Sequence, residues 1–168
     1  MNKTKKITLG CLSSILIFLI LAYVGAWLIA PGSYPRAERY KYNISEDSLI
    51  SIINQVKAEN PNLELPSSIK LPSGQTTDLN GGRRDSKDYW YTIYFYYADK
   101  NQILHTWTRP IDDNSTTFAF TAINNGLTLG NWKTINENFW WWKNKPEITE
   151  FETRILDLID EKTDTRIE

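Results

Sequence analysis

Residues 89–97 read YWYTIYFYY, a run in which every residue is aromatic or β-branched. Such side chains pack well on the pleated surface of a sheet, so this stretch predicts a β-strand. Successive side chains of a strand point to opposite faces, which places aromatic rings on both sides. A layer of helices covers one side only. We therefore expect the second face to be covered by residues 61–88, by residues 132–142 or by a partner.

Three further strands are predicted after this run, with short turns between them. The strands are expected at 103–109, 116–123 and 131–135. Two of the connections, Asp99-Lys100-Asn101 and Asn124-Asn125-Gly126, consist largely of turn-forming residues. Strands joined by such short turns pair antiparallel with their neighbours. The pattern predicts an antiparallel meander of four or five strands.

Two amphipathic helices flank the meander. Ser45 is a favourable N-cap for the first, which Asn60-Pro61 should end. The second is expected at 146–161, with Asn144 and Glu147 at capping-box spacing. The apolar stripes are Leu49, Ile52, Ile53 and Val56 in the first helix and Ile148, Phe151, Ile155, Leu158 and Ile159 in the second. We expect both helices to pack on one face of the sheet, which makes an α+β domain.

Residues 61–88 carry few signals of regular structure, because proline and glycine recur among polar residues. At most a short strand is expected at 68–71. The segment Gly81-Gly82-Arg83-Arg84-Asp85 lacks the following helix and the spacing of a phosphate-binding loop. We interpret it as a solvated turn.

Residues 7–30 form a stretch of 24 residues without Asp, Glu, Lys or Arg. A helix of that length spans about 36 Å, enough to cross the ~30 Å hydrocarbon core of a bilayer. Three lysines among residues 1–6 favour a cytoplasmic N-terminus and an extracytoplasmic C-terminal domain. The sequence thus predicts a single-pass transmembrane helix in the cell membrane. A cleaved signal peptide is the alternative, since Val24-Gly25-Ala26 would allow cleavage before Trp27.

The chain divides into five parts on this interpretation. They are a cytoplasmic stub at 1–6, a transmembrane anchor at 7–30, a linker at 31–43, an extracytoplasmic α+β domain at 44–162 and a polar tail at 163–168. Cys11, the only cysteine, belongs to the anchor, so the outer domain has no disulfide. A thiol-free extracytoplasmic domain is compatible with a bacterial cell envelope.

The charge balance argues against nucleic acid as a partner. Of the 19 Lys and Arg residues three precede the anchor, which leaves 16 against 20 Asp and Glu residues, a net charge of −4. Nucleic-acid binding needs a basic surface that can neutralise phosphates. The lipid bilayer is the first expected partner, and another envelope protein is the second.

His105 is the only histidine, and catalytic triads and most general-base schemes need one. Its place in the middle of a predicted strand favours a structural role. Asp112 and Asp113 form the nearest acidic cluster, which lacks the alternating ligands of a calcium loop. We therefore predict no catalytic residue, no metal site and no cofactor.

Aromatic residues are the one compositional excess. Nineteen lie beyond the anchor, and fifteen of these fall between Tyr89 and Trp142. Trp140, Trp141 and Trp142 follow Phe139 and cannot all point inward, because three consecutive residues face different directions in any regular structure. Three interpretations stay open: a core anchor with one residue at the rim, a contact with membrane headgroups or a neighbouring membrane protein, and stacking on a flat ligand such as a sugar.

The resulting hypothesis is a membrane-anchored envelope protein without enzymatic activity, whose outer domain binds a partner protein or ligand through an aromatic-rich surface. The residues expected at this surface are Trp140, Trp141, Trp142, Tyr94, Tyr96 and Trp107. One alternative is an envelope hydrolase that uses His105 with a nearby aspartate, Asp112 or Asp113. A second alternative is a small accessory subunit of a membrane complex, in which the anchor makes the main contacts.

Overall fold

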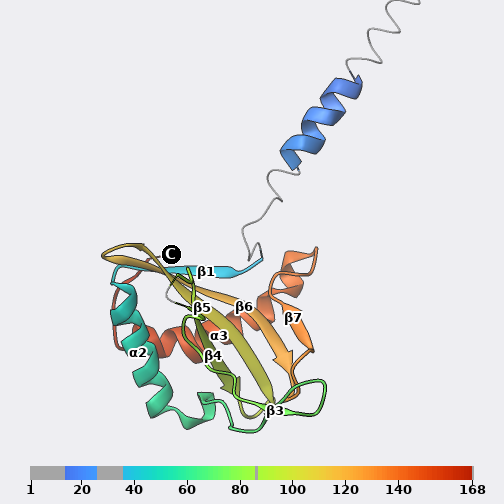
Figure 1. Ribbon diagram of the computed structural model, residues 1–168. Coiled ribbons are helices and arrows are strands. Elements are labelled where there is room, and N and C mark those ends of the chain that lie inside the picture. The colour runs from blue at the N-terminus through green and yellow to red at the C-terminus, as the bar shows by residue number, and fades with distance from the viewer. Residues whose placement is uncertain (1–13, 26–35, 86, 168) are drawn as a thin grey trace, which may run out of the picture. The chain divides into compact units, whose positions relative to one another are not determined.

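The computed structural model describes residues 14–25, 36–85 and 87–167. Their contacts separate two units, Met1–Pro35 and Arg36–Glu168. In the first unit residues 14–25 are helical throughout (Figure 1), and their large apolar side chains are exposed. Within the described residues, no helix has both the length and the apolar character needed to cross a membrane. The rest of the predicted anchor, at 7–13 and 26–30, and the predicted stub at 1–6 lie outside the described residues.

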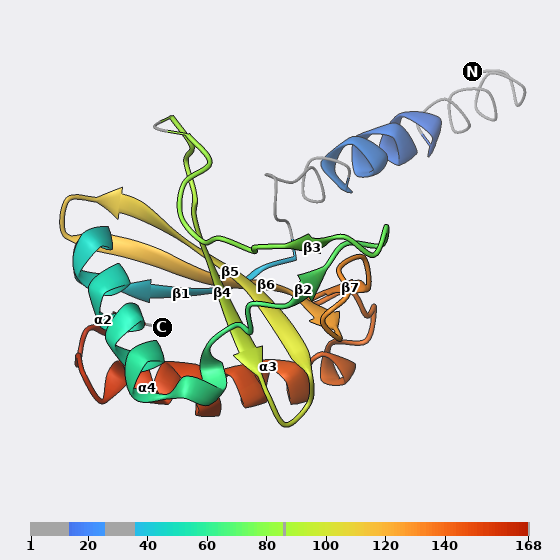
Figure 2. The ribbon, with the colours of Figure 1, turned by 60° about the horizontal axis from the view of Figure 1, so that its bottom comes forward.

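The second unit is an α+β domain with an antiparallel sheet and three α-helices. The strands of the main sheet are β1 (Glu38–Tyr42), β4 (Tyr91–Tyr97), β5 (Gln102–Asp112), β6 (Ser115–Asn125), β7 (Trp132–Thr134) and β8 (Arg166–Ile167). Their order is β4-β5-β6-β1-β8, and β7 also pairs with β6 (Figure 2). The predicted meander is present as β4 to β7, with β5 longer than expected. β1 and β7 share one edge of β6, where they pair with 116–120 and 122–124 respectively.

Two strands lie where the sequence predicts none. β1 falls within the predicted linker at 31–43, and β8 falls within the predicted polar tail at 163–168. In β1 the buried Tyr40 and Tyr42 alternate with exposed charged residues, and the Tyr42 hydroxyl donates to Asp160 Oδ1 at 3.2 Å. Five residues of alternation are too few to identify a strand in a charged stretch, so these two strands were not predicted.

Helix α2 (Glu46–Glu59) begins at its predicted cap. The Ser45 hydroxyl oxygen accepts a hydrogen bond from the Ser48 backbone amide at 3.4 Å, which satisfies one of the free amides of the first turn. The helix ends at Asn60, whose amide donates to the Lys57 carbonyl at 3.0 Å. Three members of the predicted stripe, Leu49, Ile53 and Val56, are fully buried.

The C-terminal helix consists of α3 (Lys145–Phe151), the π-helical turn η3 (Glu152–Leu156) and α4 (Asp157–Asp160). The predicted helix at 146–161 is confirmed, but the predicted capping box is wrong, because the Asn144 side chain makes no cap bond. A π turn takes up an additional residue. Leu156, five residues after Phe151, is therefore fully buried although it lies outside the predicted stripe.

One hydrophobic core joins both helices to one face of the sheet. Phe120 of β6 stacks on Phe151 of α3, with ring centroids 4.3 Å apart. The core members with no exposed surface are Tyr42, Leu49, Ile53, Val56, Phe95, Leu104, Phe118, Phe120, Phe151, Ile155, Leu156 and Ile159. Each such side chain contributes about 1.5–3 kcal/mol of burial free energy, so the domain has a hydrophobic core that does not include the aromatic residues at 139–142.

The second face of the sheet is covered in part by residues 61–88, which contain η1 (Pro61–Leu63), β2 (Ile69–Lys70) and β3 (Thr76–Thr77). The Gly82 and Thr92 backbones exchange hydrogen bonds of 2.7 and 3.0 Å, and Lys70 bonds to the loop after β6. A Cβ atom at Gly81 would lie 2.8 Å from the Thr92 carbonyl oxygen, so glycine permits this close approach. The short strand expected at 68–71 is confirmed as β2.

Candidate functional site

The candidate site is a run of four exposed aromatic residues, Phe139 to Trp142, which we call the aromatic cluster. Phe139 is 89% exposed, Trp140 50%, Trp141 62% and Trp142 51%. The sequence predicts that at least one of the three tryptophans is exposed, because consecutive side chains point in different directions. All three are exposed. Large apolar patches on the surface of a soluble domain commonly mark an interaction site.

The rings of the aromatic cluster pack against one another. Trp140 and Trp142 stack with ring centroids 4.8 Å apart and planes 27° from parallel. Phe139 meets Trp140 edge to face at 5.0 Å, and Trp141 meets Trp142 in the same manner at 6.2 Å. The Lys145 ammonium lies 4.7 Å from the Trp141 ring centroid, a cation–π contact. These contacts restrict the side chains, which lowers the entropy that binding would cost.

A pair of asparagines closes the loop that carries the aromatic cluster. Asn144 Oδ1 accepts from the Asn138 backbone amide at 3.1 Å and from Asn138 Nδ2 at 2.8 Å. Asn144 Nδ2 donates in return to the Asn138 carbonyl at 3.1 Å. Asn144 is 4% exposed and Asn138 is half-buried, so these bonds are partly shielded from water. This asparagine clamp and the 3₁₀ turn η2 (Trp141–Lys143) hold the intervening residues away from the core.

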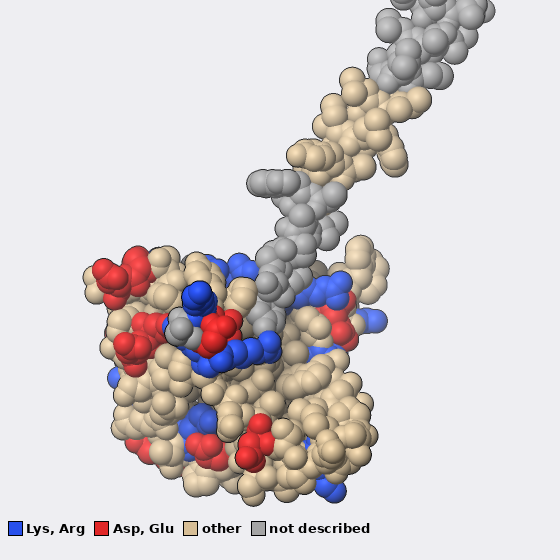
Figure 3. Space-filling model, in the orientation of Figure 1, with Lys and Arg blue, Asp and Glu red and all other residues tan. Residues whose placement is uncertain are grey.

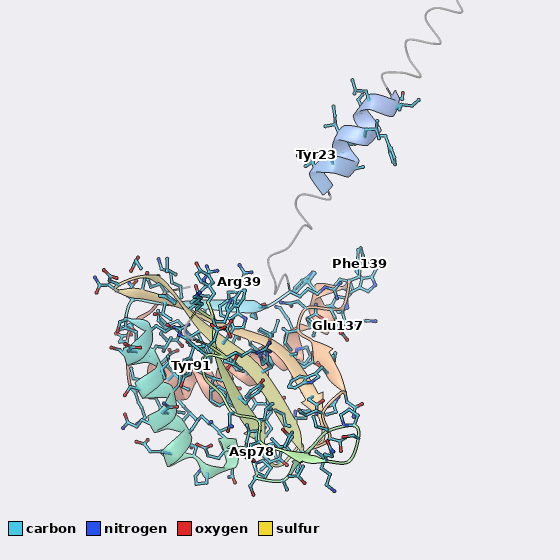
Figure 4. The ribbon with its side chains drawn as sticks, in the orientation of Figure 1. Tyr23, Arg39, Asp78, Tyr91, Glu137 and Phe139 are labelled. Atoms are coloured by element: carbon cyan, nitrogen blue, oxygen red, sulfur yellow. The ribbon has the colours of Figure 1, made fainter. Side chains whose placement is uncertain are left out.

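The aromatic cluster lies at the end of the domain where the chain joins it. Asn136 Nδ2 donates to the Arg36 backbone carbonyl at 3.2 Å and to Glu38 Oε2 at 2.7 Å. Arg36 is the first residue of the domain. Figure 4 shows Phe139 projecting from this end of the domain above Glu137. The first residue of the domain and the aromatic cluster therefore share one end.

Cationic residues flank the aromatic cluster. Lys143 and Lys145 are exposed, and so is Arg36 at the start of the domain. Glu137 is exposed beside them, whereas Glu147 is paired with Lys133 at 2.5 Å. Figure 3 shows Lys and Arg side chains gathered at this end of the domain, with acidic groups between them.

The other three predicted contact residues lie on β4 and β5. Trp107 is 2% exposed, so solvent does not reach its ring. Tyr94 packs beside His105, and the Tyr96 hydroxyl donates to Asn101 Oδ1 at 2.9 Å. Two strands, β5 and β6, stand between β4 and β7, a separation of about 14 Å at ~4.8 Å per strand. The structure does not join these residues to the aromatic cluster.

His105 is enclosed by aromatic rings on the second face of the sheet. Its ring centroid lies 5.3 Å from that of Tyr94 and 6.0 Å from that of Trp132. The Thr121 hydroxyl donates to the His105 carbonyl at 2.8 Å, so His105 Nδ1 donates its own proton to the Thr121 oxygen. Burial, assisted by the positive charge of Arg84, lowers the pKa of His105 to about 4. The ring is therefore neutral at pH 7.

The arrangement around His105 does not support the hydrolase alternative. Asp112 ends the strand on which His105 lies, seven residues away, a distance of about 23 Å at ~3.3 Å per residue. Asp112 Oδ1 accepts a hydrogen bond from the Asn114 backbone amide at 2.9 Å, so this carboxylate stabilises the turn between β5 and β6. In the part of the chain that the structure describes, no group of three His, Cys, Asp or Glu residues could hold a metal ion.

Two pockets lie beside β4, at the edge of the sheet. One of about 310 Å³ is lined by α2, the start of β4 and residues 64–81, and one of about 200 Å³ is lined by residues 80–84 and Tyr94. Arg83, predicted in a solvated turn, pairs with the buried Glu46 and donates to the Asp88 carbonyl at 3.0 Å. Neither pocket includes a residue of the aromatic cluster.

Phe139 and Lys145 belong to the site although neither was among the predicted contact residues. Phe139 adjoins the tryptophan run, and it is the most exposed of the four aromatic residues. Lys145 follows Trp141 by four residues, the spacing at which side chains meet across one helical turn. Both signals were available in the sequence.

Comparison of the chain with protein-family models, with curated proteins and with solved structures finds no match.

Proposed function

We propose that this chain is a single-pass membrane protein of a bacterial cell envelope, whose extracytoplasmic domain binds through the aromatic cluster. One observation carries the proposal: four consecutive aromatic side chains are exposed and take no part in the hydrophobic core. Phe118, Phe120 and Phe151 occupy that core with no exposed surface. The exposure of Phe139 to Trp142 is therefore a feature of the loop and its asparagine clamp.

Covering the aromatic cluster would release considerable free energy. A tryptophan side chain buries ~150–250 Å² when fully covered. At ~25 cal/mol per Å², the exposed half of one ring corresponds to roughly 2–3 kcal/mol. Several such rings side by side resemble the tryptophan-rich centres that dominate binding energy at protein interfaces. The geometry supports a binding module better than an enzyme.

The membrane anchor is part of the same proposal. Residues 7–30 are uncharged, and residues 14–25 form a helix whose apolar side chains are exposed. A helix that is apolar on all sides belongs in a bilayer or in a protein core. Lysines at 3, 5 and 6 favour a cytoplasmic N-terminus, which corresponds to an extracytoplasmic domain.

Site-specific photocrosslinking of the full chain tests the binding role. Trp141 is replaced by p-benzoylphenylalanine in one variant and Ile111 in a matched variant. Ile111 is 47% exposed near the end of β5, beside Pro110, whose partner Thr116 also pairs with Tyr42 of β1. We expect covalent adducts in bacterial membranes from position 141 that are absent from position 111. The same adduct pattern from both positions would contradict the proposal.

A second arm separates this proposal from an accessory subunit that binds through its anchor. Residues 7–30 are exchanged for an unrelated transmembrane helix, with the crosslinker kept at position 141. Binding through the domain preserves the adducts, because the aromatic cluster is unchanged. Loss of the adducts on this exchange would assign the main contact to the anchor.

A further inference from the structure

We infer that the aromatic cluster docks on the lipid headgroup region of the same membrane that holds the anchor. The inference rests on the proposed function and names its ligand. The aromatic cluster then acts as a second membrane contact, which fixes the orientation of the domain relative to the bilayer surface. Three observations carry it: the position of the aromatic cluster, its chemistry and the charge around it.

The position follows from bonds within the domain and from chain length. Asn136 binds the Arg36 carbonyl at 3.2 Å, three residues before the aromatic cluster begins. Six residue steps separate Arg36 from Ala30, the end of the uncharged run, and six steps reach at most about 22 Å. In the proposed topology, only this short length of chain separates the anchor from the end of the domain that carries the aromatic cluster.

The chemistry of the aromatic cluster matches a membrane interface. Tryptophan concentrates at the headgroup level of bilayers, where its apolar ring and polar N–H group are both accommodated. Phe139, the most exposed of the four residues at 89%, supplies a fully apolar tip. The rings form a protrusion rather than the wall of either pocket described above, and a protruding apolar group suits insertion into a soft interface.

The surrounding charges favour an anionic membrane surface. Lys143, Lys145 and Arg36 are exposed beside the aromatic cluster, against the exposed Glu137. A lysine or arginine near an anionic bilayer surface contributes about 1 kcal/mol. The domain has a net negative charge, whereas the three cationic side chains beside the aromatic cluster outnumber the carboxylates of Glu137 and Glu38 there. Because the anchor supplies a high effective concentration, a weak interfacial affinity is sufficient.

Quenching by brominated lipid in a bilayer without other proteins tests the inference. The full chain carrying Trp27→Phe, which removes the anchor tryptophan, is reconstituted in phosphatidylcholine vesicles with and without phosphatidylglycerol. The lipids carry bromine near the headgroup. We expect tryptophan fluorescence to be quenched, and the quenching to be lost when Trp140→Phe, Trp141→Phe and Trp142→Phe are added. Phenylalanine keeps an aromatic ring at each of these exposed positions, so we expect the variant to fold.

Trp132→Phe is the matched control. Trp132 is 39% exposed on β7, but it packs against His105 outside the aromatic cluster. This substitution should leave the lipid-dependent quenching in place. Lys143→Glu with Lys145→Glu should reduce quenching in the vesicles with phosphatidylglycerol and change it little in those without.

Equal quenching with and without the three cluster tryptophans would overturn the inference. The crosslinking experiment distinguishes a failure of lipid docking alone from a failure of the proposed binding function. Protein adducts from position 141 combined with no lipid quenching would keep the binding role and replace lipid by a protein partner. The absence of specific adducts from position 141 would remove the binding role itself. Lipid adducts from position 141 together with lipid quenching would support both the binding function and docking on the membrane.

Discussion

Phe120 of β6 and Phe151 of α3 stack with ring centroids 4.3 Å apart and planes only 11° from parallel. Neither ring has exposed surface. The pair joins the central strand of the sheet to the C-terminal helix, immediately before the π turn at Glu152–Leu156. The position of that helix, and of the loop that precedes it, depends on this contact.

We expect Phe151→Ala to lower the free energy of unfolding by about 3–5 kcal/mol, because it removes buried apolar surface and leaves a cavity. Denaturant unfolding monitored by circular dichroism measures the loss. Phe139→Ala is the matched control, since Phe139 is 89% exposed, and it should change stability by less than about 0.5 kcal/mol. Equal effects of the two substitutions would show that the stacked pair does not support the domain.

A second prediction concerns the buried carboxylate at the start of α2. Glu46 is 7% exposed and accepts hydrogen bonds from Arg83 and, at 2.9 Å, from Thr108 Oγ1. Arg83→Ala should destabilise the domain by roughly 3 kcal/mol, because it leaves a charge buried without its partner.

Arg84→Ala controls for the loss of one positive charge in the same loop, since Arg84 is exposed. A change within about 0.5 kcal/mol is expected for it, measured by thermal unfolding of both variants. If Arg83→Ala proves as mild as Arg84→Ala, the ion pair with Glu46 is not a structural anchor for residues 61–88.

The strands with strong local signals were predictable, and those held by distant contacts were not. The run at 89–97 is aromatic or β-branched throughout, so β4 needs no tertiary context to be recognised. β8 has two residues and exists because it pairs with β1, more than a hundred residues earlier in the chain. The π turn was not predicted either, because a sequence stripe assumes a constant helical period.

The candidate site was predictable in part for a similar reason. Three consecutive tryptophans cannot all face a core, and this geometric rule identified the exposed run. The rule does not say which ring is exposed, whereas the asparagine clamp between Asn138 and Asn144 exposes all of them. Trp107 was expected at the surface from its aromatic character, but its face of the sheet is covered and the ring is 2% exposed.

A third prediction concerns stability at acidic pH. His105 has a pKa of about 4 in the folded domain, against ~6.5 in an unfolded chain. Below pH ~6.5 His105 binds a proton in the unfolded chain but stays neutral in the folded domain. The free energy of unfolding therefore falls until the pH reaches about 4. The loss amounts to roughly 3 kcal/mol.

His105→Gln should remove this loss, because glutamine does not titrate and can still donate a hydrogen bond to Thr121. The measurement is the free energy of unfolding of both proteins across that pH range, with the difference between them as the readout. Carboxylates titrate in both proteins and cancel in the difference. A constant difference from neutral pH down to about pH 4 would mean that His105 is accessible to protons in the folded domain.

The last prediction concerns membrane topology. Cys11 is the only cysteine, so Cys11→Ser provides a background without thiols. In that background Asp164→Cys lies at an exposed position near the C-terminus, and Thr4→Cys lies before the anchor. An uncleaved anchor with a cytoplasmic N-terminus makes the cysteine at position 164 reactive in intact cells toward a membrane-impermeant maleimide.

The cysteine at position 4 should react only after the cells are permeabilised, because the bilayer separates it from the reagent. The reverse labelling pattern would contradict the proposed orientation. Cleavage after Ala26 would remove position 4 from the mature chain, so no label would be gained on permeabilisation while position 164 remained reactive. In that case the domain would lose its tether, and membrane binding would depend entirely on the aromatic cluster. Release of the labelled domain into the medium would then show that the aromatic cluster alone does not hold it at the bilayer.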